Sequence, residues 1–342
     1  MSEFGSGFEK ELPIPDRNLD TKMSLESEQA MNELFKEDFD GVETENAEDS
    51  QMEINAESEM KSLFADDFSE EQDGSGNNDD TDEVERRETI DLTKQYEPNS
   101  KFEVEGKTYE TDDNGNVYKI DGYELRPNSE YTIDGVTYKT DDHGRIVSCD
   151  GQAKSTPDGE RDLKAQNMAG GEDRKPGDQG GHILARIFGG AKGIENMLAM
   201  RGTAINQSVY KRMENEIAKA LEDGKDVYIH VDVEYEGDSQ RPSKITVKYT
   251  IDGKETNIQF DNDEGSTDLA DSLEGKIEDD DLNDLKQEIQ DAEEDGANIS
   301  VVSVKTEYDA EGNILKVTVT IRDDNSEHPV NEDRVYTPKE EA

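Results

Sequence analysis

The sequence predicts an α+β protein with antiparallel sheet, preceded by a disordered acidic region and followed by a helix–hairpin extension. Short runs of β-branched and aromatic residues alternate with polar residues and are broken by Gly turns, which is typical of β-hairpins. Two segments carry apolar residues at helical spacing. The first 89 residues are polar and acidic, with few groups to bury.

The composition excludes several classes of protein. The 342 residues include 87 Asp and Glu but 37 Lys and Arg, for a net charge of −50, and only 30% are hydrophobic. Cys149 is the one cysteine, so neither a disulfide framework within one chain nor a cysteine zinc site can form. Because no apolar run approaches the roughly 20 residues that span a bilayer, we expect no membrane partner. The N-terminus lacks the basic start and apolar stretch of a secretory signal peptide.

The charge is unevenly distributed. Residues 1–89 contain 7 basic and 29 acidic residues, whereas residues 174–219 contain 8 basic and 4 acidic residues, a net charge of +4. A strongly acidic chain repels nucleic acid, but this basic island leaves one segment that could bind it.

Residues 1–95 form the predicted acidic region, and one pattern occurs in it twice. The segment 31–39 (MNELFKEDF) returns 29 residues later as 60–68 (MKSLFADDF). Two short amphipathic turns with aromatic anchors could dock into a partner's groove. A drifted duplication without a partner explains the pattern equally well.

A second repeat has the same offset and predicts hairpins. Residues 98–122 match residues 127–151, and each copy has short strand-like runs separated by Gly turns. An EF-hand is not expected at the turn tips, because the closing Glu and the spacing of acidic residues are missing.

The rest of the chain predicts a helix followed by a hairpin, and then a second helix followed by a second hairpin. Residues 151–180 look irregular, a helix is expected from about 206 to 221, and a hairpin over 227–251. A second helix (282–294) and hairpin (301–321) form the expected C-terminal extension, residues 261–342. This second helix and hairpin are either a duplicated half-unit or an extension of the sheet.

His182 is the histidine that the sequence singles out for chemistry. Of the four histidines, His143, His230 and His328 lie in a turn tip, on the polar face of a strand and in a charged tail. His182 follows two glycines and leads into the apolar run ILARIFGG. Glycines let the backbone pass close to a substrate, so His182 could present its ring at a cleft.

Asn206 and Glu214 form a second polar pair. Asn206 stands where a helix N-cap is favoured, which is the structural explanation for this residue. On an α-helix, Glu214 would lie about 12 Å further along the axis and about 80° around it. Both cannot readily bind one ion directly, so Glu214 is better placed to hold a metal-bound water.

These motifs together resemble the DNA/RNA non-specific endonuclease family. Among the branches of this family, the pattern is most similar to the one with type VII secretion EssD-like nuclease toxins. The pattern consists of Gly-Gly-His, then ILARIFGG, Glu195-Asn196, and Asn206 with Glu214 eight residues on. The resemblance covers about residues 96–260, the expected nuclease domain. It implies a ββα-metal fold, His182 as general base, Asn206 as the Mg²⁺ ligand and Glu214 as the helix acid, with Mn²⁺ as a substitute ion. Asn196 matches a further polar position of the motif.

One departure concerns arginine. Many relatives have Asp-Arg-Gly-His, whereas Gln179 and Gly180 stand at the first two positions here. The candidates for contacting the phosphate are then Arg186, Arg201 and Arg212, with Arg145 a weaker one, and we expect Gly181 and Lys211 to face the substrate.

The expected activity is hydrolysis of DNA and RNA phosphodiester bonds with low sequence specificity. The resemblance implies a secreted toxin, exported by a non-Sec route from the cytoplasm, with an immunity or secretion partner for the N-terminal region. The alternative is an acidic interaction protein on a catalytically degenerate nuclease scaffold. The net charge and the missing arginine favour that alternative, and the set of His182, Asn206 and Glu214 favours the enzyme.

Overall fold

The computed structural model describes residues 90–156 and 162–339. The chain divides into two units, Met1–Glu83 and Val84–Ala342, and every described residue belongs to the second. The predicted acidic repeats at 31–39 and 60–68 therefore lie outside the described residues.

The two 29-residue repeats fold alike, which confirms the predicted hairpins. Each is an antiparallel three-stranded meander, and the strands are β1 (Lys101–Val104), β2 (Lys107–Thr111), β3 (Val117–Ile120), β5 (Glu130–Ile133), β6 (Val136–Thr140) and β7 (Ile146–Gln152). In each turn tip an aspartate, Asp112 or Asp141, accepts two backbone N–H groups through Oδ1. The first repeat pairs with β4 (Glu124–Leu125), whereas the second joins the large sheet.

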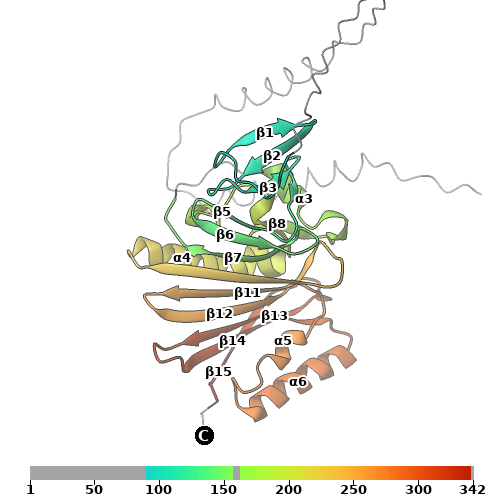
Figure 1. Cartoon of the computed structure of the whole chain (residues 1–342). Helices are drawn as coiled ribbons and strands as arrows, with labels where there is room; N and C mark the ends of the chain where they lie inside the picture. Colours follow the sequence, from blue (N-terminus) through green and yellow to red (C-terminus); the bar gives the residue numbers. More distant parts are fainter. Residues whose placement is uncertain (1–89, 157–161, 340–342) are drawn as a thin grey trace, which may run out of the picture. The chain divides into compact units, whose positions relative to one another are not determined.

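That large sheet has nine antiparallel strands in the order β15-β14-β13-β12-β11-β10-β7-β6-β5 (Figure 1). Its remaining strands are β10 (Val227–Tyr235), β11 (Pro242–Ile251), β12 (Lys254–Asp261), β13 (Ile299–Tyr308), β14 (Ile314–Asp323) and β15 (Glu332–Tyr336). Both hairpins expected in this part of the chain are confirmed. Strands β12 and β15 were not predicted. β15 is a short, charged edge strand, and such strands resemble loops in sequence.

The helices begin at different residues from those expected. The predicted helix at 206 begins earlier, as a π-helix, Gly202–Tyr210, which continues into α4 (Lys211–Glu222). Asn206 is therefore inside the helical segment, and its interpretation as an N-cap is wrong. α6 (Asp279–Glu294) begins three residues before the expected start, and α3 (Leu163–Met168) lies in a segment expected to be irregular.

Helices cover both faces of the sheet. α4 packs in a core that includes Ile258 of β12, whereas α5 (Asp268–Asp271) and α6 pack in a second core that includes Val304 of β13. Ile258 is opposite Lys305, so Val304 projects from the other face. Because two strands separate β10 from β13 in this antiparallel sheet, the second helix–hairpin runs in the opposite direction. Its helix also lies on the opposite face.

Candidate functional site

His182 is the last residue of the first strand of a two-stranded antiparallel sheet. This sheet pairs β8 (Asp178–His182) with β9 (Met197–Arg201), so that Gly181 is opposite Leu198 and His182 is opposite Met197. A buried ion pair fixes its first residue, because Nε of Arg241 lies 2.6 Å from Oδ2 of Asp178 and both side chains are 3% exposed.

The absence of arginine at position 180 has a steric cause. A Cβ atom on Gly180 would lie 2.3 Å from the carbonyl oxygen of Gln166 in α3. The main chain of α3 thus occupies the space that an arginine side chain would enter. The guanidinium of Arg174 donates to that same carbonyl oxygen at 2.7 Å, so a cation does lie nearby, bound to main-chain oxygens.

The amide of Asn206 is oriented by Gln179. Its Nδ2 donates to Oε1 of Gln179 at 2.9 Å, and within the described residues its Oδ1 accepts no hydrogen bond. Oδ1 lies over Gly181, where a Cβ atom would be only 2.7 Å away. A neutral amide oxygen fixed in this way is a suitable ligand for a hard cation such as Mg²⁺.

The side chain of His182 and the amide of Asn206 lie on different faces of β8. Asn206 lies against Gly181. Successive strand residues project to opposite faces, so His182 and Gly180 share the other face of β8. That face is the one covered by α3. No hydrogen bond between His182 and Asn206 is found in the described part of the chain. The two residues are brought to the same end of β8, and Gly181 is the residue between them.

Tyr210 and Glu214 connect the helix to the segment after His182. The hydroxyl of Tyr210 donates to the carbonyl oxygen of Ile183 at 2.5 Å. Glu214 lies one turn further along, and burial raises its pKa, which the nearby Lys211 only partly offsets. The Nζ of Lys211 is 3.8 Å from Oε2 of Glu214, and the Lys211 side chain is exposed. The π-helix also means that the angle expected between Asn206 and Glu214 on an α-helix does not apply.

Asn196 holds the main chain after His182 and is not available as a ligand. Its Oδ1 accepts from the N–H of Leu184 at 3.0 Å, and its Nδ2 donates to the carbonyl oxygens of Leu184 and Ala191, both at 2.8 Å. Its neighbour Glu195 forms a buried ion pair with Lys119 of β3 at 3.0 Å. These contacts tie the first repeat to the sheet that carries His182.

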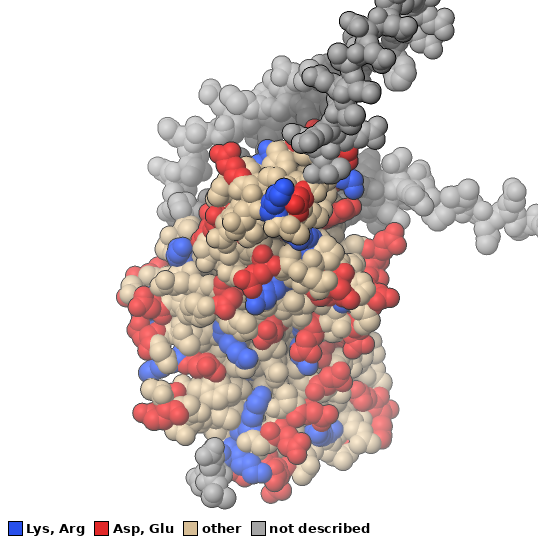
Figure 2. Space-filling model, viewed as in Figure 1, with Lys and Arg blue, Asp and Glu red and all other residues tan. Residues whose placement is uncertain are grey.

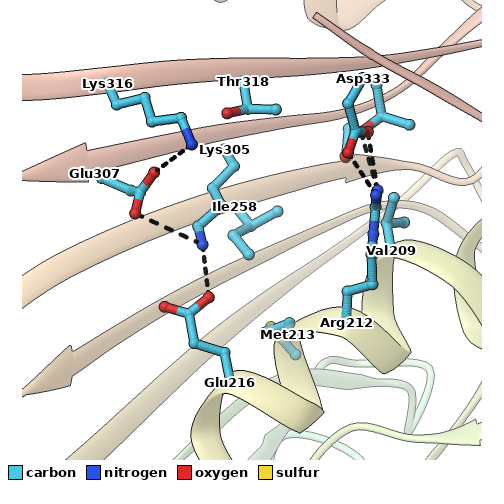
Figure 3. Close-up of a pocket in the computed structure, with 12 residues that line it drawn as sticks. Val209, Arg212, Met213, Glu216, Ile258, Lys305, Glu307, Lys316, Thr318 and Asp333 are labelled. Atoms are coloured by element: carbon cyan, nitrogen blue, oxygen red, sulfur yellow. Dashed lines mark hydrogen bonds and ion pairs between the residues drawn. The ribbon is translucent and has the colours of Figure 1, made fainter. Parts of the chain in front are cut away.

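Arg201 and Arg212, two of the arginines expected at the phosphate, pair with carboxylates far along the chain. Arg201 is 5% exposed, and its Nη2 lies 2.6 Å from Oδ1 of Asp324. Arg212 forms two hydrogen bonds with Asp333 of β15, at 2.5 and 3.0 Å, as Figure 3 shows. Arg145 bonds to Asp141 in its own turn. These contacts favour structural roles for all three, contrary to the expectation.

Arg186 differs from the other candidates. It lies four residues after His182 in a 3-10 turn, Arg186–Phe188. Its Nε is buried and makes no hydrogen bond within the described residues. Among the described residues, no carboxylate pairs with it. A buried guanidinium nitrogen without a partner is costly unless a ligand satisfies it.

The basic island seen in the sequence is largely neutralised in the fold. Of its eight cations, at least five pair with carboxylates of the described residues, and these are Lys175, Arg201, Lys211, Arg212 and Lys219. On the face shown in Figure 2, basic side chains are interspersed among more widespread acidic ones. The local charge of +4 therefore does not translate into a continuous basic surface on that face.

Sequence reasoning missed the roles of Gln179 and Tyr210. Gln179 was noted only as a departure from an acidic position, although its spacing of two residues from Gly181 places both on one face of β8. Tyr210 gave no signal beyond its large apolar ring. The centroid of this ring lies 5.2 Å from that of the Phe260 ring.

Another cluster of metal-binding residue types is present in the described chain but lies in a turn. Asp141, Asp142 and His143 are close enough to share an ion. Oδ1 of Asp141 accepts two backbone N–H groups, and its Oδ2 accepts from Nε of Arg145 at 2.7 Å. We assign this cluster to the turn, as the sequence predicted.

Residues 127–253 match the family described as DNA/RNA non-specific endonuclease. This segment, with its antiparallel strands and few helices, is therefore similar to that nuclease family. No helix of the described residues is long and apolar enough to cross a membrane.

Parts of the chain also match individual proteins. The type VII secretion system protein EssD of Staphylococcus aureus (strain USA300) is 43% identical over 111 residues, which is 31% of this chain and 18% of that protein. The protein of strain NCTC 8325 / PS 47 has the same values. The matched segment thus spans less than a fifth of these relatives' length. The crystal structure of NucA from Streptococcus agalactiae with magnesium ion bound has 14% sequence identity and a TM-score of 0.30, over 48% of this chain and 84% of that one.

Proposed function

We propose that this chain is a metal-dependent endonuclease of low sequence specificity that hydrolyses phosphodiester bonds of DNA and RNA. The observation that carries the proposal is the orientation of Asn206. Gln179 binds its amide nitrogen, which leaves the oxygen directed at Gly181, beside His182, within a segment that matches a nuclease family.

In the proposed mechanism, His182 is the general base. A neutral imidazole at the end of β8 would take a proton from the attacking water. Because strand alternation directs His182 and Gly181 to different faces, this proposal requires the water to lie past the end of β8, between His182 and Asn206. Asn206 would bind Mg²⁺ through Oδ1, and Glu214 would act through a metal-bound water. A bound Mg²⁺ would neutralise charge that develops on the phosphoryl and leaving oxygens, and Mn²⁺ can substitute.

Arg186 is the arginine that best fits the phosphate. Its buried Nε lacks a protein partner within the described residues, and the other candidates pair with carboxylates. A phosphate oxygen would satisfy it with a charge-assisted hydrogen bond. Gly181 and Lys211 would border the substrate. None of these contacts reads a base edge, which accounts for the expected low specificity.

The domain arrangement and the export route are also proposals. We assign residues 1–95 to a partner-binding region, 96–260 to the ββα-metal nuclease domain and 261–342 to a C-terminal extension. The relatives' description as type VII secretion proteins supports export by that route. A role as a secreted toxin is part of the proposal. An immunity or secretion partner would bind the N-terminal region.

A second candidate function is an acidic interaction protein on a degenerate nuclease scaffold. The arrangement of β8 favours it, because strand alternation directs His182 and Gly181, on which Asn206 lies, to different faces. The pairing of at least five of the eight basic-island cations with carboxylates of the described residues also favours it.

Digestion of supercoiled plasmid and of RNA separates the two candidates. The wild type should cleave both with Mg²⁺ and neither with EDTA. His182→Ala should lose about 10²-fold or more in rate, the usual contribution of a general base, and should still bind Mn²⁺ in solution. Asn206→Ala should lose both cleavage and Mn²⁺ binding. His230→Ala, on the polar face of β10, is the matched control and should resemble the wild type. Equal cleavage by wild type and His182→Ala would exclude the enzyme mechanism.

A further inference from the structure

The π-helix that carries Asn206 is bound by side chains from the C-terminal extension (residues 261–342). Asn331, just before β15, donates from Nδ2 to the carbonyl oxygen of Ala204 at 2.7 Å and to Oγ of Ser208 at 2.9 Å. These two groups lie on either side of Asn206 along the chain. One amide of the extension therefore bridges the turn from which the proposed metal ligand projects.

Arg322 of β14 supports Asn331 in this position. Its Nη1 donates to Oδ1 of Asn331 at 3.2 Å, and its Nη2 donates to Oγ1 of Thr203 at 3.1 Å. Because Oδ1 of Asn331 faces this arginine, Nδ2 must face the π-helix. The orientation of the Asn331 amide is thus set by the extension itself.

The extension also binds the residues that flank the π-helix. Before it, the N–H of Arg201 donates to Oδ1 of Asn262 at 2.9 Å, and the Arg201 guanidinium pairs with Asp324. After it, Arg212 pairs with Asp333, next to a cavity of about 230 Å³ between α4 and the sheet (Figure 3). All of these partners lie beyond residue 253, where the family match ends.

A π-helix is a rare conformation, and it persists where surrounding contacts stabilise it. A nine-residue π segment with contacts from the extension before it, within it and after it fits that requirement. We propose that the C-terminal extension is the positioning element of the metal site, and that Asn331 is a positioning residue that acts on Asn206 through the π-helix. This inference rests on the proposed nuclease function for its effect on metal binding, but the holding of the π-helix stands independently of it.

Asn331→Asp in the full chain tests the proposal. The carboxylate keeps an acceptor for Arg322 and removes both hydrogen bonds donated to the π-helix. Asn331→Ala is the second variant, in case the added charge prevents folding. Glu288→Gln is the matched control, because it breaks an ion pair within the same extension (with Arg334, at 2.6 Å) that does not touch the π-helix.

The first readout is amide hydrogen exchange over residues 202–210, which does not depend on activity. We expect exchange there to become about 10-fold faster in the Asn331 variants and to remain at the wild-type rate in Glu288→Gln. The second is the Mg²⁺ concentration for half-maximal cleavage. It should rise about 10-fold or more, as for other residues that orient a metal ligand, with kcat at saturating Mg²⁺ near the wild-type value.

Exchange that is unchanged, or changed equally in the control, would overturn the proposal. Faster exchange with an unchanged Mg²⁺ requirement in an active enzyme would also overturn it, because the π-helix would then not position the ligand. A wild type that shows no Mg²⁺-dependent cleavage would instead refute the proposed function, and the exchange measurement would still decide whether Asn331 holds the π-helix.

Discussion

The amide oxygen of Asn206 lies against Gly181 so closely that no side chain fits between them. A Cβ atom at position 181 would be 2.7 Å from this oxygen and 2.8 Å from Sδ of Met200. The second glycine of the Gly-Gly-His motif is therefore required by a contact with a residue 25 positions further along the chain. This relationship places the proposed metal ligand next to the proposed base.

Gly181→Ala should disable the site while the fold is retained. The added methyl group must displace Asn206 or Met200, and displacement of the amide oxygen should lower affinity for the metal about 10-fold or more. Mn²⁺ binding and the Mg²⁺ requirement for cleavage measure this effect. Gly151→Ala, in β7, is the control, since its Cβ would meet Val136 at 3.2 Å, away from the site. If both variants bind Mn²⁺ like the wild type, the contact has no role in metal binding.

Glu214 should make stability depend on pH in a defined direction. Burial raises its pKa in the folded state above the ordinary value of 4.5, so the folded protein binds more protons than the unfolded chain just above that pH. Its contribution to stability is then greatest at low pH and is lost as the pH rises through the raised pKa. Glu214→Gln should therefore gain stability relative to the wild type between pH 4 and pH 7.

Urea unfolding of both proteins at the two pH values measures this difference. A stability difference that is the same at pH 4 and at pH 7 would contradict the raised pKa. At pH 7 the same variant should cleave nucleic acid about 10-fold more slowly, because it removes the carboxylate proposed to hold a metal-bound water.

Arg201 and Arg186 should respond differently to replacement by alanine. Arg201→Ala removes one of the two arginines that pair with Asp324, the other being Arg322, and should lower the free energy of unfolding by about 1.5–3 kcal/mol. Arg186→Ala removes no ion pair among the described residues, so it should leave Tm near the wild-type value and raise KM for nucleic acid. Thermal unfolding and steady-state kinetics separate the two. An Arg186→Ala variant with unchanged kinetics would show that this arginine does not contact the substrate.

Local patterns in the sequence were sufficient to predict much of the fold. The 29-residue repeats predicted hairpins because alternation and Gly turns act over a few residues, and hairpins are present in both copies. The motif around His182 also led to the nuclease family, which the match over residues 127–253 supports. The start of the helix was predicted wrongly, because Asn206 has the chemistry of an N-cap and nothing local signals a π-helix.

The sequence by itself determined the hairpins of the repeats, the hairpins at 227–251 and 301–321, the amphipathic helix and the Gly-Gly-His motif, because backbone preference and side-chain periodicity are short-range properties. Tertiary structure decided which arginine side chains pair with carboxylates and which could contact a substrate. Arg201 meets Asp324 across 123 residues and Arg212 meets Asp333 across 121, pairings that no spacing rule reveals. It also placed α3 over Gly180 and Asn331 over the π-helix, since steric exclusion and hydrogen bonding between distant segments exist only once the sheet has assembled.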